Sequence, residues 1–174
     1  MPAAPNPRAP IQVPGRTFDE LETGLCFLSP ARTITEADIV LFAGLSGDMN
    51  PLHIDAESCK RTPFRQRIAH GMLIQSVATG LGWQTGLFHG TIQALQQVSV
   101  RFEKPVLAGD TIQLALTVAE RDPAPTPRRG WVRFATRVTN QHGESVSEGE
   151  WMTLMSRRPA KLIVLGERDA RAGD

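Results

Sequence analysis

A carboxylate and an imidazole stand five positions apart in residues 46–55, SGDMNPLHID. The two groups belong to Asp48 and His53, residue types that exchange protons with a substrate or with water. The segment also holds Gly47, which reaches backbone angles closed to other residues, and Pro51, whose φ is fixed. A five-residue span reaches about 16 to 18 Å when fully extended. The segment is therefore expected to be an irregular loop that curls until both side chains reach one point.

The pair suits general acid–base chemistry, because an unperturbed imidazole titrates with a pKa of about 6.5. Asp48 would need partial burial to act as an acid, since burial raises a carboxyl pKa whereas a neighbouring cation lowers it. For an isolated aspartate and histidine, a structural interpretation would be favoured, in which Asp48 caps a turn and His53 is a hydrogen-bonded residue of the core. The irregular loop at residues 46–55 and the glycine that follows His70 at a helix start favour a catalytic role for the pair instead. His70 itself is expected to hold the loop through its ring nitrogens.

A helix of about ten residues, ending near residue 45, is expected to deliver the chain into this loop. Thr35 is a good N-cap residue, and Asp38 stands at the third helical position. Ile34 and Ile39 have the spacing of a hydrophobic staple. The helix is therefore expected to set the direction in which the chain enters the loop.

A second helix is expected over residues 70–85, whose sequence HGMLIQSVATGLGWQT is apolar almost all the way round. A helix without a polar face is a buried helix. Gly80 and Gly82 weaken it by up to about 1 kcal/mol each relative to alanine, so a closely packed sheet is expected against them. In its first turn, the amide of Gly71 has no partner within the helix, and the helix dipole favours negative charge there.

From residue 91 the apolar period changes from that of a helix to that of a strand. An irregularity is expected near residues 95–97, a bulge at Gly149, and a stiff proline-rich connection over residues 122–130. A single antiparallel sheet covers only one side of the buried helix, so a second copy of the chain is expected to cover the rest, as a homodimer or an assembly of dimers. The expected strands are 24–30, 92–102, 112–120, 132–138, 146–155 and a short edge strand at 161–165.

Composition bounds the class of protein. The chain has 174 residues, of which 41% are hydrophobic and 21% charged, and a formal net charge of +1. These values fit one globular domain with no electrostatic footprint for nucleic acid or an anionic membrane. Cys26 and Cys59 lack metal-type spacing and are expected to be reduced thiols of a cytoplasmic protein. Residues 1–14 are rich in proline and are expected to be a loose arm without a signal peptide or membrane span, and residues 159–174 a short strand and flexible tail.

Three stretches of the chain carry a family resemblance: FAGLSGDMNPLHID at residues 42–55, IAHGM at 68–72 and VRFEKPVLAGDT at 100–111. Together they resemble the MaoC-like (R)-specific enoyl-CoA hydratases. The first stretch is specific, because a whole string of positions agrees in type and order, whereas the others recur in hot-dog proteins of several activities. The resemblance implies an α+β hot-dog fold, with an antiparallel sheet wrapped around a long central helix in one domain at residues 15–158. It also implies a dimer that binds a coenzyme A thioester near the subunit interface.

The resemblance implies roles for five residues. Asp48 and His53 become the catalytic pair, Asn50 orients the site, Gly71 donates its N–H to the thioester oxygen, and Thr79 helps to position the acyl chain. The implied reaction is reversible hydration of trans-2-enoyl-CoA to (R)-3-hydroxyacyl-CoA, with no metal or redox cofactor. The pair is expected to activate water jointly, with Asp48 handling the α-carbon proton. The acyl chain, the carrier (coenzyme A or acyl carrier protein) and the pathway within fatty acid metabolism stay open.

Three other functions fit parts of the sequence. A hot-dog thioesterase would share the fold and the acyl-CoA substrate. A non-catalytic acyl-CoA-binding partner subunit would not need the complete Asp–Asn–His set. His53 and Asp55 are also two-thirds of a facial iron triad, with His70, His89 or His142 as the third ligand, although a long apolar helix does not suit the jelly roll of such enzymes.

Overall fold

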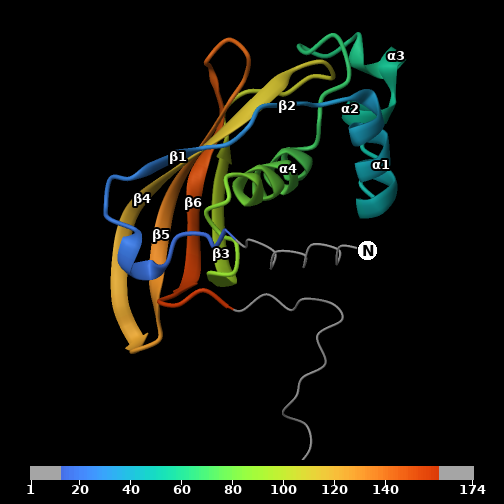
Figure 1. Ribbon diagram of the computed structural model, residues 1–174. Helices are drawn as coiled ribbons and strands as arrows, with labels where there is room; N and C mark the ends of the chain where they lie inside the picture. The colour runs from blue at the N-terminus through green and yellow to red at the C-terminus, as the bar shows by residue number, and fades with distance from the viewer. Residues whose placement is uncertain (1–12, 161–174) are drawn as a thin grey trace, which may run out of the picture.

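The computed structural model describes residues 13–160, apart from the side chains of residues 123–125. An antiparallel sheet of six strands wraps around one long helix, α4 (Gly71–Gln84), and shorter helices lie beyond one end of the sheet (Figure 1). The strand order is β1-β4-β5-β6-β3, and β2 pairs with β4 off this path. The predicted α+β architecture is thus confirmed. The strands are β1 Cys26–Leu28, β2 Arg32–Thr33, β3 Ile92–Phe102, β4 Thr111–Thr126, β5 Arg129–Thr139 and β6 Ser145–Ser156, and a 3-10 turn, η1, spans Phe18–Glu20.

The helix α1 (Glu36–Ser46) begins where the sequence predicts. The hydroxyl oxygen of Thr35 accepts a hydrogen bond from the amide of Asp38 at 3.2 Å. The Asp38 carboxylate accepts in return from the amide and the hydroxyl of Thr35, each at 2.8 Å. Arg32 donates to the other carboxylate oxygen at 2.6 Å. These bonds satisfy amides at the helix start that have no partner within the helix.

Replacing Asp38 by asparagine is expected to lower the free energy of unfolding by about 1 kcal/mol at neutral pH. Burial raises the pKa of Asp38, but the hydrogen bonds from Thr35 and the charge of Arg32 outweigh it, so the net pKa lies below the ordinary 3.8. Folding therefore favours the charged carboxylate. This stabilisation is present above the ordinary value and is lost as the pH falls through the lower, folded-state value. Urea unfolding at neutral and acid pH measures it, and a difference between D38N and wild type that stays equal at both would contradict the assignment.

The hydrophobic core lies between α4 and the sheet. Ile34 and Ile39, the predicted staple pair, are both fully buried in it. A Cβ at Gly82 would lie 3.0 Å from the ring of Trp151, which confirms the close neighbour predicted for that glycine. At Gly80 the same prediction is wrong, because no atom of the described residues lies within 4 Å of a Cβ there. β4 supplies alternate inward-facing residues, Ile112, Leu114, Leu116 and Val118.

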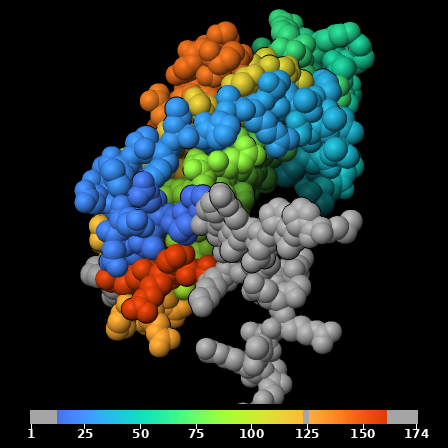
Figure 2. Space-filling view, viewed as in Figure 1, coloured from blue at the N-terminus to red at the C-terminus, as the bar shows by residue number. Residues whose placement is uncertain are grey.

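One face of α4 is open in the single chain, in line with the prediction that a single sheet covers only one side of this helix. Met72 and Trp83 on this face are 55% and 52% exposed, and Thr79 is exposed between them. In Figure 2 the green atoms of this part of the chain reach the surface between the blue segment that precedes α1 and the cyan atoms of α1. One curved sheet covers one side of a helix, which leaves the other side for a different partner.

The longest strand, β4, extends further than the sequence predicts. It continues to Thr126, so most of the proline-rich connection predicted at residues 122–130 is strand. Its pairing with β5 shifts register between Asp122 and Pro125, in a stretch where proline has no N–H to donate to the ladder.

The bulge predicted at Gly149 is also wrong, because Gly149 pairs in register with Val100 of β3 and Thr136 of β5. A Cβ at this position would lie 1.9 Å from the carbonyl oxygen of Ser99. Glycine is therefore required here for the close approach of two strands rather than for an extra residue.

The ends of the chain carry several of the sequence predictions. Residues 1–12 of the predicted arm and the strand predicted at residues 161–165 lie outside the described residues.

Within residues 13–160, no helix has both the length and the apolar character needed to cross a membrane. Cys26 is exposed and Cys59 buried, and both are free, as predicted.

Candidate functional site

The segment that carries Asp48 and His53 curls as predicted, but through a different local structure. Gly47 ends α1 in the left-handed conformation, with φ of 76°. Pro51–Ile54 then forms one helical turn, α2, so the prediction that residues 46–55 hold no regular structure is wrong. Proline is favoured at the first position of a helix. Asn50 caps this turn, because its side-chain oxygen accepts from the amide of Leu52 at 3.0 Å.

The turn of α2 brings the predicted pair together. One carboxylate oxygen of Asp48, one ring nitrogen of His53 and one of His70 lie within 4.8 Å of one another. A separation of this size lets one water molecule contact both Asp48 and His53. His53 is buried, whereas Asp48 is exposed in the single chain, so the partial burial expected of Asp48 is absent there. The carboxylate is oriented by the amide of Asn50, which donates to it at 3.2 Å.

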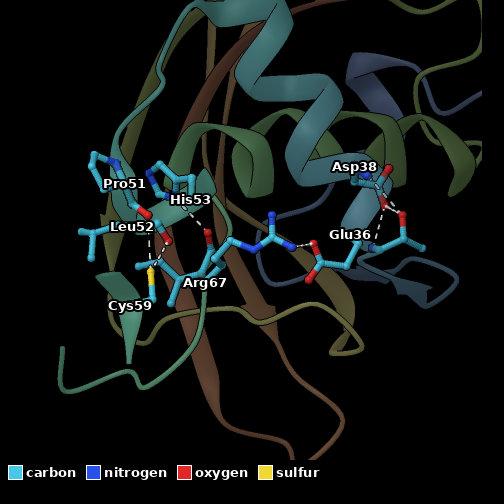
Figure 3. Close-up of polar contacts among 9 residues, drawn as sticks. Glu36, Asp38, Pro51, Leu52, His53, Cys59 and Arg67 are labelled. Carbon is cyan, nitrogen blue, oxygen red and sulfur yellow. Dashed lines mark hydrogen bonds and ion pairs between the residues drawn. The ribbon is translucent and has the colours of Figure 1, made fainter. Parts of the chain in front are cut away.

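A main-chain carbonyl binds one ring nitrogen of His53 (Figure 3). Its Nδ1 lies 2.8 Å from the carbonyl oxygen of Ile68. A carbonyl oxygen only accepts, so Nδ1 carries the proton and Nε2 of the neutral ring presents a lone pair. The amide of Ile68 donates back to the carbonyl of Leu52 at 3.0 Å. The buried thiol of Cys59, in the next turn α3 (Ala56–Cys59), donates to the carbonyls of Pro51 and Leu52, each at 3.4 Å. The turn α2 is therefore held on two sides.

An ion pair links the same region to α1. Arg67 donates to the carboxylate of Glu36, in the first turn of α1 (Figure 3). Both side chains retain contact with solvent, so the pair contributes little stability by itself. The ion pair lies beside the candidate site, because Arg67 directly precedes Ile68, whose carbonyl oxygen accepts the hydrogen bond from Nδ1 of His53.

His70 lies against His53 and also contacts the loop of Asp48. The centroids of the two imidazole rings are 3.6 Å apart and their planes are tilted by 28°. Nε2 of His70 donates to the main-chain carbonyl of Asp48 at 3.0 Å. This bond confirms the prediction that His70 holds the loop through a ring nitrogen. Nδ1 of His70 is buried and has no partner among the described residues.

Gly71 begins α4 and lines a cavity of about 380 Å³ together with His53. Within residues 13–160 its amide donates no hydrogen bond to the protein. The half-exposed ring of Phe102 stands over it, so that a Cβ at Gly71 would lie 2.7 Å from that ring. Phe64 and Lys104 complete the wall. The cavity thus offers apolar surface, a free amide donor and the His53 ring in one place, with Asp48 just outside the lining.

A larger cavity, of about 790 Å³, lies near the C-terminal end of α4 and is lined in part by Arg16, Phe27 and Thr85. It contains none of the residues that the sequence predicts for the site. Size alone therefore does not select the candidate site. The smaller cavity is the candidate because His53 and Gly71 both line it.

Two further predicted residues lie apart from the cavity lining. Thr79 is on the exposed face of α4, about 12 Å along the helix axis from Gly71. Its hydroxyl donates to the carbonyl of Ser76 at 2.7 Å. Asn50 is exposed, and its side-chain oxygen is engaged in capping α2. The structure therefore brings Asn50 next to Asp48 but does not bring Thr79 to the same point.

The iron triad suggested by His53 and Asp55 is not assembled. Asp55 caps α3: its carboxylate accepts from the amides of Glu57 and Ser58, each at 2.9 Å. The hydroxyl of Ser58 also donates to it and, more than any other contact, holds the pKa of Asp55 below its ordinary range. The carboxylate is thus committed to the helix start.

Asp48, His53 and His70 supply donor types that bind divalent transition metals. An imidazole lone pair lies in the plane of its ring, however, and the two rings stack 3.6 Å apart with a tilt of only 28°. Their lone pairs cannot converge on one ion at the usual bonding distance of about 2.1 Å. The arrangement suits proton transfer better than metal ligation.

The family profile described as MaoC like domain matches residues 24–136, which include the Asp48 loop and the start of α4. The chain belongs to the MaoC-like family. Among MaoC-like relatives, an (R)-specific enoyl-CoA hydratase from Rhodospirillum rubrum is 36% identical over 141 residues, which is 81% of this chain and 92% of the relative. R-Hydratase PhaJ1 from Pseudomonas aeruginosa has a solved structure that is 35% identical, with a TM-score of 0.66, covering 87% of this chain and 96% of that one.

A crystal structure of the MaoC-like dehydratase from Rhodospirillum rubrum superposes with a TM-score of 0.77 at 26% identity, covering 83% of this chain and 99% of that one. The hot-dog fold expected for a MaoC-like chain is thus confirmed. Sequence reasoning missed Phe64, Phe102 and Lys104 as walls of the MaoC-like cavity. Phe102 and Lys104 lie within the motif at residues 100–111, which was a usable signal, whereas Phe64 stands in an irregular segment with none.

Proposed function

We propose that this MaoC-like hydro-lyase catalyses reversible hydration of trans-2-enoyl-CoA thioesters to (R)-3-hydroxyacyl-CoA. The observation that carries the proposal is the meeting of Asp48 and His53 within 4.8 Å, next to the free amide of Gly71 at the start of α4. The named (R)-specific hydratases among the relatives support the same reaction and its stereochemistry.

In the proposed mechanism, one water molecule lies between Asp48 and His53. The lone pair on Nε2 of His53 faces this water, because Nδ1 is committed to the carbonyl of Ile68. Asp48 and His53 together remove a proton from the water, whose oxygen forms a bond to the β carbon of the enoyl group. The proton taken from the water passes to the Asp48 carboxylate, which delivers it to the α carbon, so that both side chains end in their starting states. The reverse sequence expels water and restores the double bond.

Charge that develops on the thioester oxygen is stabilised by the amide of Gly71. A backbone N–H in the first turn of a helix has no internal partner and lies at the positive end of the helix dipole. A donor aimed at such an oxygen typically lowers the barrier by about 2.7 to 4 kcal/mol. The proposed role of Asn50 is to shape the loop that carries Asp48. Thr79 is proposed to meet the acyl chain further along α4.

Replacing Gly71 by alanine is expected to lower kcat/KM about 10- to 100-fold, because small displacements of the reacting group have effects of that order. The added methyl would lie 2.7 Å from the Phe102 ring and beside the amide that receives the thioester oxygen. Steady-state kinetics measure the effect. The matched control is G44A, because Gly44 lies on α1 and a Cβ there meets no described atom within 4 Å. An unchanged kcat/KM in G71A would remove this amide from the mechanism.

The proposed functional unit is a homodimer. β3 forms one edge of the sheet and exposes Leu95, Val98 and Phe102, and the open face of α4 lies on the uncovered side of the helix. An apolar edge strand left exposed invites association. A second copy over this edge would bury these side chains and reduce the exposure of Asp48. Sedimentation analysis is expected to give a dimer, and a monomer at assay concentrations would contradict this part of the proposal.

The direct test follows loss of the enoyl thioester absorbance across a panel of chain lengths and branching patterns, carried on coenzyme A or on acyl carrier protein. Hydration is expected without release of free thiol, and chiral analysis should give the (R) product. Thiol release without hydration would identify a thioesterase instead. Substrate that binds but stays unchanged would identify a non-catalytic binding subunit.

A further inference from the structure

We infer that His70 is a positioning residue that holds both members of the proposed catalytic pair through two separate contacts. One contact is made to the ring of His53 and the other to the main chain of Asp48. The kinetic part of this inference rests on the proposed hydratase function, whereas its structural part does not.

The first contact fixes the plane of the His53 ring. His53 has one directional bond, from Nδ1 to the carbonyl of Ile68 at 2.8 Å. One such bond leaves the ring able to pivot about it, since the outer torsion of a histidine has a broad energy profile. The face of His70, 3.6 Å away, blocks that pivot. Nε2 of His53 is therefore kept pointing in one direction.

The second contact fixes the main chain that bears the Asp48 carboxylate. The other hydrogen bonds of Asp48 among the described residues are local: its amide donates to the hydroxyl of Ser46 at 3.2 Å, and its carboxylate accepts from the amide of Asn50 at 3.2 Å. Local bonds shape a loop but do not place it in the molecule. The bond from Nε2 of His70 spans 22 residues and ties Asp48 to the start of α4 at 3.0 Å.

His70 can serve as a reference point because it is itself immobilised. It is 2% exposed, the ring of Phe42 lies against it at 5.1 Å, and its own carbonyl accepts from the amide of Ile74 in α4 at 3.2 Å. It also directly precedes Gly71. His53, Asp48 and Gly71 are therefore all positioned relative to one residue, His70, at the start of a rigid helix. Precise catalytic geometry requires this kind of support.

A space-filling role alone does not account for this ring. Nδ1 of His70 is buried without a partner among the described residues, and burying a polar atom unpaired is unfavourable. Phenylalanine would fill the same space without that cost, but it could not donate to Asp48. The imidazole combines a flat face and a donor in one side chain, and both are used.

Three substitutions separate the two contacts. H70F keeps a flat ring but loses the donor, H70Q keeps an N–H donor but loses the ring, and H70A loses both. We expect kcat to fall about tenfold in each of the first two and about 100-fold in H70A. KM should change little, because the cavity wall and the Gly71 amide are retained. H89A is the control, since the ring of His89 packs on Trp83 at 4.6 Å, away from the pair.

A double substitution distinguishes positioning from general destabilisation. In the H53N background, H70A should slow the residual reaction much less than it slows the wild type, because part of its effect acts through His53. An equal loss in both backgrounds, or a loss confined to KM, would overturn the inference. A kcat of wild-type size in H70A would do the same.

A readout independent of activity is the NMR shift of the His53 ring protons, assigned by their absence in H53N. A face-to-face neighbour shifts these signals, so H70A and H70Q should move them and H70F should largely retain them. If the protein proves inactive on every enoyl thioester, the hydratase proposal fails while this measurement still tests His70. Identical His53 signals in all variants would show that the rings do not stack in solution.

Discussion

Asn in place of Asp48 is expected to lower kcat for enoyl thioester hydration by about three orders of magnitude, within the usual range for loss of a general acid–base group. The substitution is nearly isosteric. Its side-chain oxygen can still accept from the amide of Asn50, as the carboxylate does at 3.2 Å, so the loop should keep its shape. What is lost is the ability to take up and return a proton. Initial rates with saturating substrate measure the change.

The control for D48N is E22Q, which removes one negative charge from an exposed residue before β1. It should leave kcat unchanged, and both variants should unfold within about 0.5 kcal/mol of wild type, as surface substitutions usually do. Turnover of wild-type size in D48N would remove Asp48 from the mechanism and leave His53 as the sole candidate base.

Asparagine at position 53 is expected to reduce kcat by about 10²- to 10⁴-fold. The Asn side-chain nitrogen stands close to where Nδ1 of His53 stands, so it can still donate to the carbonyl of Ile68, now at 2.8 Å. Nε2, the nitrogen proposed to receive the water proton, has no counterpart in Asn. The variant therefore removes the proposed base and keeps the contact that holds α2.

Rates of H53N should be compared with those of H142N, because His142 lies in the exposed turn before β6. The double variant D48N/H53N should be about as slow as the slower single variant, since residues that act on one water as a unit have non-additive effects. Losses that multiply in the double variant would mean that Asp48 and His53 act on separate steps.

Features set by neighbouring residues could be predicted from the sequence. The capping of α1 by Thr35 and Asp38, the start of α4 at Gly71 and the alternation in β4 each depend on residues a few positions apart. The curl of the Asp48 loop was predictable for the same reason. Its cause was not, because proline in a sequence is compatible both with a break in regular structure and with the first position of a helix, which Pro51 occupies.

Features set by long-range packing could not be predicted. Nothing in the spacing of His53 and His70 indicates that their rings stack, since their approach depends on how α2 and α4 are placed by the sheet. The open face of α4 is a partial example: the sequence predicts that one sheet leaves one side of this helix open, but apolar composition does not tell which side.

The close contact of β3 and β6 at Gly149 restricts how this protein can vary over generations. Only a hydrogen atom fits between residue 149 and the carbonyl oxygen of Ser99, and β3 ends at Phe102, the ring that stands over Gly71. A library randomised at codon 149 and selected only for folded protein should return glycine. Selection for a stably paired β3 would thereby keep Phe102 in place as one wall of the candidate cavity, without any selection on turnover.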